Sequence, residues 1–131
     1  MDEEFTRLSR GSAAPRSKLQ AANMHYNKAK NRNANVLAFD DTRVKLSAIT
    51  GIDGSDYINA NFIDQYMMRR AFIATRVPLP DTIPDFWRMS WEQKSSTIVI
   101  LSKETESRKV LGRMLKKKIE RKKRKGSSIP K

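Results

Sequence analysis

Short apolar runs separated by turn-forming residues make up the middle of this sequence. Runs rich in branched and aromatic side chains predict β-strands at residues 36–39, 43–46, 57–63, 71–75 and 97–101. The last run, Thr-Ile-Val-Ile-Leu, is typical of a strand that is covered on both faces. Asp40 and Asp41 and the cluster at 51–55 supply turn residues between these runs, and residues 67–70 are expected in a solvated hairpin loop.

Between residues 79 and 94 the apolar spacing lengthens from two residues to nearly four, which predicts a helix. Phe86 and Met89 fall on one face of this helix, while Trp87 and Trp91 lie one turn apart. These aromatic side chains offer a large apolar area for burial against the predicted strands. The helix and the strand that follows it are therefore expected to belong to the core.

The same helix has recognisable signals at its start. Asp81 or Thr82 can cap its first amide groups, and Pro84 falls in the first turn, where a proline removes no hydrogen bond. Before the strands, residues 1–30 are polar, with a short helix predicted around 18–28. A chain of 131 residues with this pattern predicts one α/β (α+β) domain, with a twisted mixed sheet and a tryptophan-rich helix.

The composition excludes several kinds of site. The sequence has no cysteine and a single histidine, His25. Disulfides and thiolate metal sites are thereby excluded, and we expect neither a metal nor a cofactor. No stretch approaches eighteen apolar residues, and the acidic, polar start MDEEFTRLSR is unlike a signal peptide. These features predict a soluble, intracellular chain located in the cytoplasm.

Several short motifs follow one another in a fixed order. They are Asn-Lys-Ala-Lys-Asn-Arg at 27–32, Arg-Val at 43–44, Asp-Tyr-Ile-Asn-Ala at 56–60, Ile-Ala-Thr at 73–75, Pro-Leu at 78–79 and Asp-Phe-Trp-Arg-Met at 85–89. Together they closely resemble the protein tyrosine phosphatases. The segments at 35–40 and 54–61 resemble the cytoplasmic domains of receptor-type members in the leukocyte-antigen-related group.

This resemblance runs from about residue 26 to about residue 109 and covers less than half of the family's domain. It implies an incomplete protein-tyrosine-phosphatase fold, the N-terminal part of a catalytic-type domain. We expect a polar lead-in at 1–25, a truncated tyrosine-phosphatase-like domain at 26–108, and a basic tail at 109–131 that is disordered or forms a short amphipathic helix.

The resemblance also implies a chemistry that depends on sulfur. In the family, a low-pKa cysteine in a His-Cys-(five residues)-Arg loop attacks phosphorus, the loop holds the oxyanion, and a Trp-Pro-Asp loop supplies the acid. None of these segments occurs in this sequence, and no histidine–carboxylate pair is available to activate a hydroxyl group instead. We therefore expect this chain by itself to be catalytically inactive.

The segment that corresponds to the family's phosphotyrosine loop is present in altered form, and we expect it to be vestigial. Its candidate residues are Lys30, Asn31, Arg32, Asn33 and Asn35. Asn33 replaces a tyrosine that stacks on phosphotyrosine in the family, so about 0.5–1.5 kcal/mol of stacking free energy would be absent. Likewise, Val77 replaces a glycine and resists a positive φ angle.

Two arginines in the matched region have alternative interpretations. We expect Arg32 and Arg43 to be structural partners in ion pairs or hydrogen bonds, and a vestigial anion-binding role is the alternative. The motifs at 56–60 and 86–91 are expected to form core rather than a site.

Positive charge is concentrated at the C-terminus. Residues 109–131 include eleven basic residues and one acidic residue, a net charge of +10 out of +13 for the chain. The candidate binding residues of this tail are Lys116, Lys117, Lys118, Arg121, Lys122, Lys123, Arg124 and Lys125. Nucleic-acid phosphates, an anionic membrane or a nuclear import receptor could use them, and an unselected extension is the alternative.

Three functions stay open from the sequence. The first is an inactive, truncated tyrosine-phosphatase-like chain that acts as an interaction or interfering fragment, with phosphotyrosine-signalling proteins or another phosphatase domain as partners. The second is phosphotyrosine dephosphorylation by a longer form of the same gene. The third is binding of nucleic acid or an anionic membrane by the basic tail, which would also permit nuclear localisation.

Overall fold

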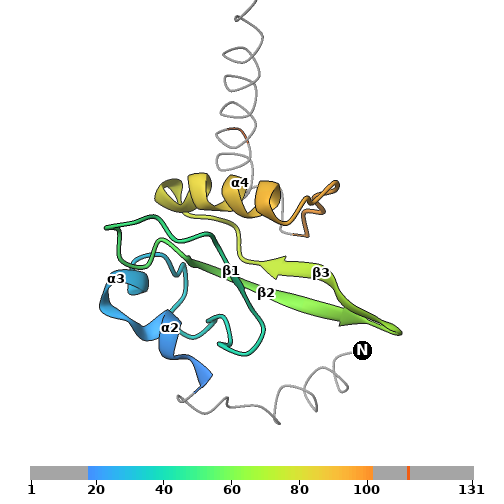
Figure 1. Ribbon diagram of the computed structural model, residues 1–131, viewed down its shortest axis with the longest axis horizontal. Coiled ribbons are helices and arrows are strands. Elements are labelled where there is room, and N and C mark those ends of the chain that lie inside the picture. Colours follow the sequence, from blue (N-terminus) through green and yellow to red (C-terminus); the bar gives the residue numbers. More distant parts are fainter. Residues whose placement is uncertain (1–17, 102–111, 113–131) are drawn as a thin grey trace, which may run out of the picture.

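The computed structural model describes residues 18–101 and Gly112. Its elements follow the order α2 (Gln20–Asn23), α3 (His25–Lys28), β1 (Arg43–Lys45), β2 (Tyr57–Gln65), β3 (Met68–Thr75), η2 (Pro80–Thr82) and α4 (Ile83–Glu92) (Figure 1). The predicted fold class, a partial domain that mixes helices with a sheet, is confirmed. Among the described residues, no helix is both long and apolar enough to cross a bilayer.

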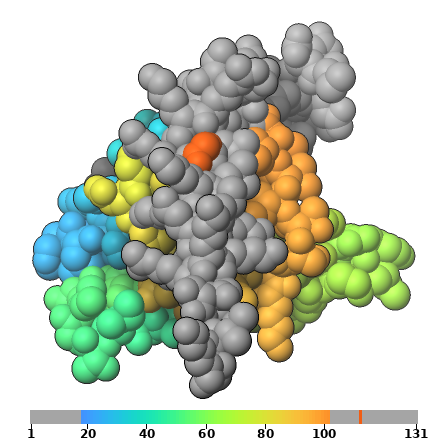
Figure 2. All heavy atoms as spheres, turned by 90° about the horizontal axis from the view of Figure 1, so that it is seen from above, coloured from blue at the N-terminus to red at the C-terminus, as the bar shows by residue number. Residues whose placement is uncertain are grey.

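The described strands form an antiparallel sheet in the order β1-β2-β3. β2 and β3 make a long hairpin whose tip projects beyond the neighbouring elements (Figures 1 and 2). The turn is shorter than the loop expected at residues 67–70, since β2 ends at Gln65 and β3 begins at Met68. The predicted solvent exposure of this turn is confirmed, because Met67 is 89% exposed.

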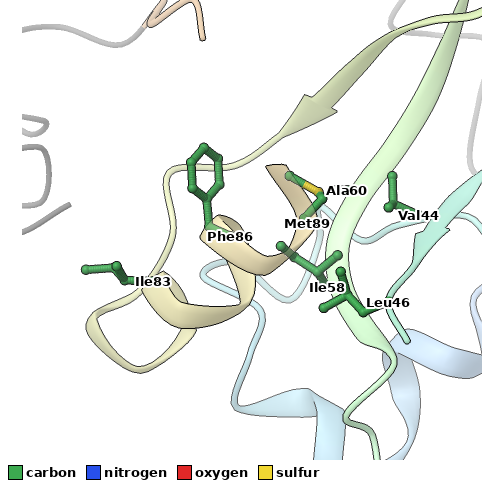
Figure 3. Packing of buried hydrophobic residues seen from close by; sticks show 7 residues of the cluster. All are labelled: Val44, Leu46, Ile58, Ala60, Ile83, Phe86 and Met89. Carbon is green, nitrogen blue, oxygen red and sulfur yellow. The ribbon is translucent and has the colours of Figure 1, made fainter. Parts of the chain in front are cut away.

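The core lies between α4 and one face of the sheet. Its buried cluster consists of Val44, Leu46, Ile58, Ala60, Ile83, Phe86 and Met89 (Figure 3). Phe86 and Met89 share the buried face of α4, as the spacing predicts, and the rings of Phe86 and Trp87 are nearly perpendicular at a centroid distance of 5.5 Å. Trp91, by contrast, is 79% exposed, so the expected burial of both tryptophans is wrong for this residue.

The start of α4 differs from the expected capping. Thr82 occupies the cap position, but its hydroxyl oxygen accepts a hydrogen bond from the Leu79 N–H at 2.9 Å instead of binding an amide of the helix. That bond closes the short turn η2, which leads into α4. Pro84 lies in the first turn, as predicted.

The helix expected around 18–28 is divided in two. Met24 has extended backbone angles, φ −58° and ψ 139°, and it separates α2 from α3. The carboxylate of Asp40 accepts hydrogen bonds from the N–H groups of Gln20 at 2.6 Å and Ala21 at 3.0 Å. This side chain therefore fixes the first turn of α2 against the loop that precedes β1.

Residues 36–39 do not form the predicted strand. Two carbonyl groups of this segment accept hydrogen bonds from asparagine side chains of β2: Val36 from Asn59 at 2.8 Å and Phe39 from Asn61 at 3.2 Å. Because side-chain amides take these acceptors, the segment lies beside β2 without a backbone ladder.

The strand predicted at 97–101 is also absent. Instead of being covered on both faces, this segment is exposed, with exposed fractions of 75% at Val99 and 95% at Leu101. No described strand pairs with it. An apolar run of this kind predicts a strand only where a neighbouring strand satisfies its backbone.

Candidate functional site

Asn31 anchors the segment that was expected to be a phosphotyrosine loop. Its side-chain amide donates to the carbonyl oxygens of Ala22 and Asn27, both at 3.2 Å. Its side-chain oxygen accepts a hydrogen bond of 2.7 Å from the hydroxyl group of Tyr57 on β2. Asn31 therefore ties the helical N-terminal part to the sheet.

Lys30 and Arg32 flank this anchor and both donate to backbone carbonyl groups. The ammonium group of Lys30 donates to the Gly54 carbonyl oxygen at 2.5 Å. The guanidinium group of Arg32 reaches across the fold to the carbonyl oxygens of Val77, at 2.9 Å, and Pro78, at 3.0 Å. The two cations thereby hold neighbouring loops together.

Asn33 and Asn35 form a local turn at the surface. The side-chain oxygen of Asn33 accepts a hydrogen bond from the Asn35 N–H at 2.8 Å, and its carbonyl oxygen accepts one from the Val36 N–H at 3.2 Å. Both asparagine side chains are exposed. An asparagine suits such a turn because its side chain mimics a backbone carbonyl, but it offers no aromatic face.

Lys30 and Arg32 also line a small cavity beside β2 and the segment 75–79. Its wall is completed by Tyr57, Ile58, Asn59, Thr75, Arg76, Val77, Pro78, Leu79, Thr82 and Asp85. The space inside it that a water molecule can occupy is ≈ 20 Å³, close to what one water needs.

Tyr57 is fully buried behind this cavity. Burial raises the pKa of its hydroxyl group from 10.0 to about 12, although the hydrogen bond with Asn31 and the charge of Arg43 act in the opposite direction. The hydroxyl group therefore stays protonated and serves as a donor to Asn31. Its position indicates a structural role.

Arg43 pairs with Asp56 at 2.8 Å between the start of β1 and the start of β2. The Arg43 side chain is only 11% exposed and that of Asp56 is 37% exposed. The structural interpretation of Arg43, a partner in an ion pair, agrees with this contact. For Arg32, too, the described contacts are structural, since both go to backbone carbonyl oxygens.

The sequence analysis missed two side chains that fix the loop around Ser55. Arg88 on α4 donates to the carbonyl oxygen of Ser55 and, at 3.4 Å, to that of Ser47. Glu92, one turn later, accepts a hydrogen bond of 2.9 Å from the Ser47 N–H. Arg88 and Glu92 lie four residues apart and so share a face of α4, but this spacing does not identify their common partner, Ser47.

The remaining expectations concern Val77, the basic tail, the domain boundaries and metal binding. Val77 adopts no positive φ angle, as expected for a residue with a branched side chain. The candidate residues of the basic tail lie outside the described residues, as does most of the region 109–131, and the proposed domain boundaries stay predictions. Within residues 18–101, no three histidine, aspartate or glutamate side chains gather as a metal site.

Comparison with known sequences decides the family. The model of the family described as protein-tyrosine phosphatase matches residues 27–127, most of the chain. The chain belongs to the protein-tyrosine phosphatase family. The match extends beyond residue 109, where the sequence analysis places the end of the resemblance.

Individual relatives are receptor-type members. Receptor-type tyrosine-protein phosphatase F of Homo sapiens is 53% identical over 89 residues, which cover 68% of this chain and 5% of that protein. Receptor-type tyrosine-protein phosphatase S of Gallus gallus is 56% identical over the same length, covering 68% and 6%. Tyrosine-protein phosphatase Lar of Drosophila melanogaster is 49% identical, covering 68% and 4%. The chain thus spans only about one twentieth of the length of these relatives, and the predicted resemblance to their group is confirmed.

Proposed function

We propose that this chain is a non-catalytic member of its family that acts as an interaction or interfering fragment, with phosphotyrosine-signalling proteins or another phosphatase domain as partners. The observation behind this proposal is the arrangement of the altered phosphotyrosine loop. Lys30 donates to the carbonyl oxygen of Gly54, and Arg32 donates to those of Val77 and Pro78. These two cations therefore stabilise the fold, and their described hydrogen bonds go to the chain itself.

The composition supports the same proposal. The family's reaction requires a thiolate as nucleophile, and the 131 residues contain no cysteine. Asn33 lies in a surface turn where the family has an aromatic wall, so that a bound phosphotyrosine would also lack its stacking partner. We therefore expect the chain to lack both the nucleophile for hydrolysis and the aromatic contact that strengthens phosphotyrosine binding.

The test is hydrolysis of a phosphotyrosine peptide by the purified chain. We expect release of phosphate to equal that of a heat-denatured control, in the presence and absence of vanadate. Asn33→Tyr should leave the rate at this background, because an aromatic wall adds binding but no nucleophile. Vanadate-sensitive turnover by the unmodified chain would contradict the proposal.

A second candidate function is phosphotyrosine dephosphorylation by a longer polypeptide that includes this segment. It is favoured by the names of the relatives, all of which are tyrosine-protein phosphatases. The transcript sequence beyond the codon of Arg108 tests it. A frame that encodes the cysteine loop there would support the longer form, and its absence would exclude it for this transcript.

The charge of the tail favours a third candidate function, binding to nucleic acid or an anionic membrane through residues 109–131. Binding of this kind weakens steeply with salt and should be lost when the tail is deleted. Equal binding with and without the tail would exclude it. We propose the cytoplasm as the location, with entry into the nucleus through the same tail.

A further inference from the structure

β3 lies at one edge of the described sheet. The order β1-β2-β3 pairs one side of β3 with β2, and no described strand pairs with its other side (Figure 1). The strand is long, from Met68 to Thr75, and most of its residues are exposed. A strand edge of this length presents backbone donors and acceptors to any segment that can pair with it.

The hydrogen bonds of β2 show which groups of β3 face outward. Phe62 of β2 donates its N–H to Thr42 on the β1 side at 2.8 Å, and Ile73 lies directly opposite Phe62. This pair is therefore not hydrogen-bonded across β2 and β3, and Ile73 directs its N–H and C=O away from β2. Because the direction alternates along a strand, Ala71 and Thr75 do the same.

A bulge limits the usable edge at its start. Arg70 has a φ of 54°, and its N–H donates to the Asp64 carboxylate at 2.7 Å. The register between β2 and β3 shifts at this point. Regular strand pairing is therefore available over residues 71–75 only.

Positive charge lies at both ends of this five-residue stretch. Arg69 and Arg70 precede it, Arg76 follows it, and all three residues are exposed. None of the three forms an ion pair within residues 18–101. On the outer face of the hairpin, the opposed residues Ile63 and Phe72 are 45% and 58% exposed and add an apolar surface.

We propose that the β3 edge binds an extended acidic segment of a partner protein by strand addition. The backbone of the segment would pair with Ala71, Ile73 and Thr75, and its acidic residues would lie beside the arginines at the two ends. Opposite charges across paired strands stabilise the pairing, and they select acidic partners over others. This inference rests on the proposed interaction function and names the partner's chemistry.

A second copy of this chain fits the edge poorly. Antiparallel self-pairing centred on Ile73 would place Arg76 of one copy directly opposite Arg70 of the other. Like charges in directly opposed positions destabilise a strand pair, and each copy has a net charge of +13. Self-association through this edge is therefore disfavoured.

The test uses a fluorescein-labelled peptide, Asp-Glu-Val-Thr-Val-Thr-Val-Glu-Asp, and the full chain at physiological salt. We expect saturable binding, together with slower amide hydrogen exchange at Ala71, Ile73 and Thr75. A peptide with lysine at the acidic positions should not bind. A peptide with proline in place of the first and last valines keeps the charge but lacks two of the N–H groups that would face β3, and it should bind at least about tenfold more weakly.

Charge-reversal variants locate the binding site. The double variant Arg69→Glu/Arg76→Glu should weaken binding about tenfold, because attraction becomes repulsion at both ends. The matched control is the double variant Lys45→Glu/Lys28→Glu, which makes the same change of net charge at exposed residues away from β3 and should have a much smaller effect. Circular dichroism checks that the variants stay folded.

Equal binding of the valine–threonine and proline peptides would overturn the proposal, because it would reveal attraction by net charge alone. Equal effects of the two double variants would do the same, as would a dimer that forms through the edge in sedimentation experiments. Absence of any peptide binding would also overturn it. The hydrolysis test of the proposed function is independent of these outcomes.

Discussion

At the scale of single residues, two glycines in the loop before β2 differ in their surroundings. Gly51 has a φ of +80° and Gly54 a φ of +68°, so both adopt a conformation that side chains rarely occupy. A Cβ atom on Gly54 would lie 2.2 Å from the side-chain oxygen of Asn27 and 2.6 Å from the ring of Tyr26. At Gly51 no atom lies within 4 Å of that position.

Alanine substitutions separate backbone strain from close packing. Gly51→Ala should cost about 1–2 kcal/mol for the left-handed backbone alone. Gly54→Ala should cost about 1–3 kcal/mol more, because Asn27 is buried and its side chain must move. The readout is hydrogen exchange of the Tyr57 N–H, which bonds to the Gly54 carbonyl oxygen at 2.9 Å.

Exchange should accelerate by roughly tenfold in Gly51→Ala and by roughly a hundredfold or more in Gly54→Ala. Similar acceleration in the two variants would show that the contact with Asn27 and Tyr26 adds nothing. The pair is well matched because both residues lie in one loop and gain the same methyl group.

At the scale of elements, the end of α4 shows a defined termination. Lys94, just past the helix, has a φ of 53°. Its N–H donates to the Trp91 carbonyl oxygen at 3.1 Å, and the Ser95 N–H donates to that of Ser90 at 2.9 Å. This is the Schellman pattern, in which a glycine usually occupies the left-handed position.

Lys94→Gly should therefore stabilise the end of α4 by about 1 kcal/mol, because glycine adopts this backbone without steric cost. Lys94→Ala is the control, since it removes the same charge and keeps the Cβ atom. Amide exchange at Ser95 should slow roughly fivefold in the glycine variant and stay unchanged or quicken in the alanine variant. If exchange at Ser95 slows equally in both variants, the cause is the lost charge of Lys94 and not its backbone conformation.

Local periodicity was sufficient to predict α4 and most of the β2–β3 hairpin. It failed for residues 36–39 and 97–101, although both are apolar, because a strand also requires a partner for its backbone. Asn59 and Asn61 supply side-chain partners to the first segment, and no described strand pairs with the second. Spacing within a segment contains no information about such partners.

The candidate loop was likewise predicted only in part. Its residues and the loss of the aromatic wall at Asn33 follow from the sequence motif. The partners of Arg32 lie 45 and 46 positions away, at Val77 and Pro78, and only the folded chain brings them together.

At the scale of the whole molecule, apolar burial among the described residues is one-sided. The buried apolar cluster lies where α4 covers the sheet, whereas Ile63 and Phe72 on the hairpin and the run 98–101 stay exposed. Cooperative unfolding depends on contacts that link all parts of a structure. A chain with this distribution of apolar surface has a small cooperative core and weakly attached elements.

Thermal melting of the purified chain should therefore lack a sharp cooperative transition. The amides of residues 97–101 should exchange almost as fast as in an unfolded peptide, because their side chains are exposed and no described strand pairs with them. The amides around Ile58 and Ala60, inside the cluster, should be the best protected and provide the internal control. Calorimetry together with residue-resolved hydrogen exchange measures both quantities. A two-state melt with strong protection at 97–101 would contradict this prediction, since it would require these apolar side chains to be covered in solution.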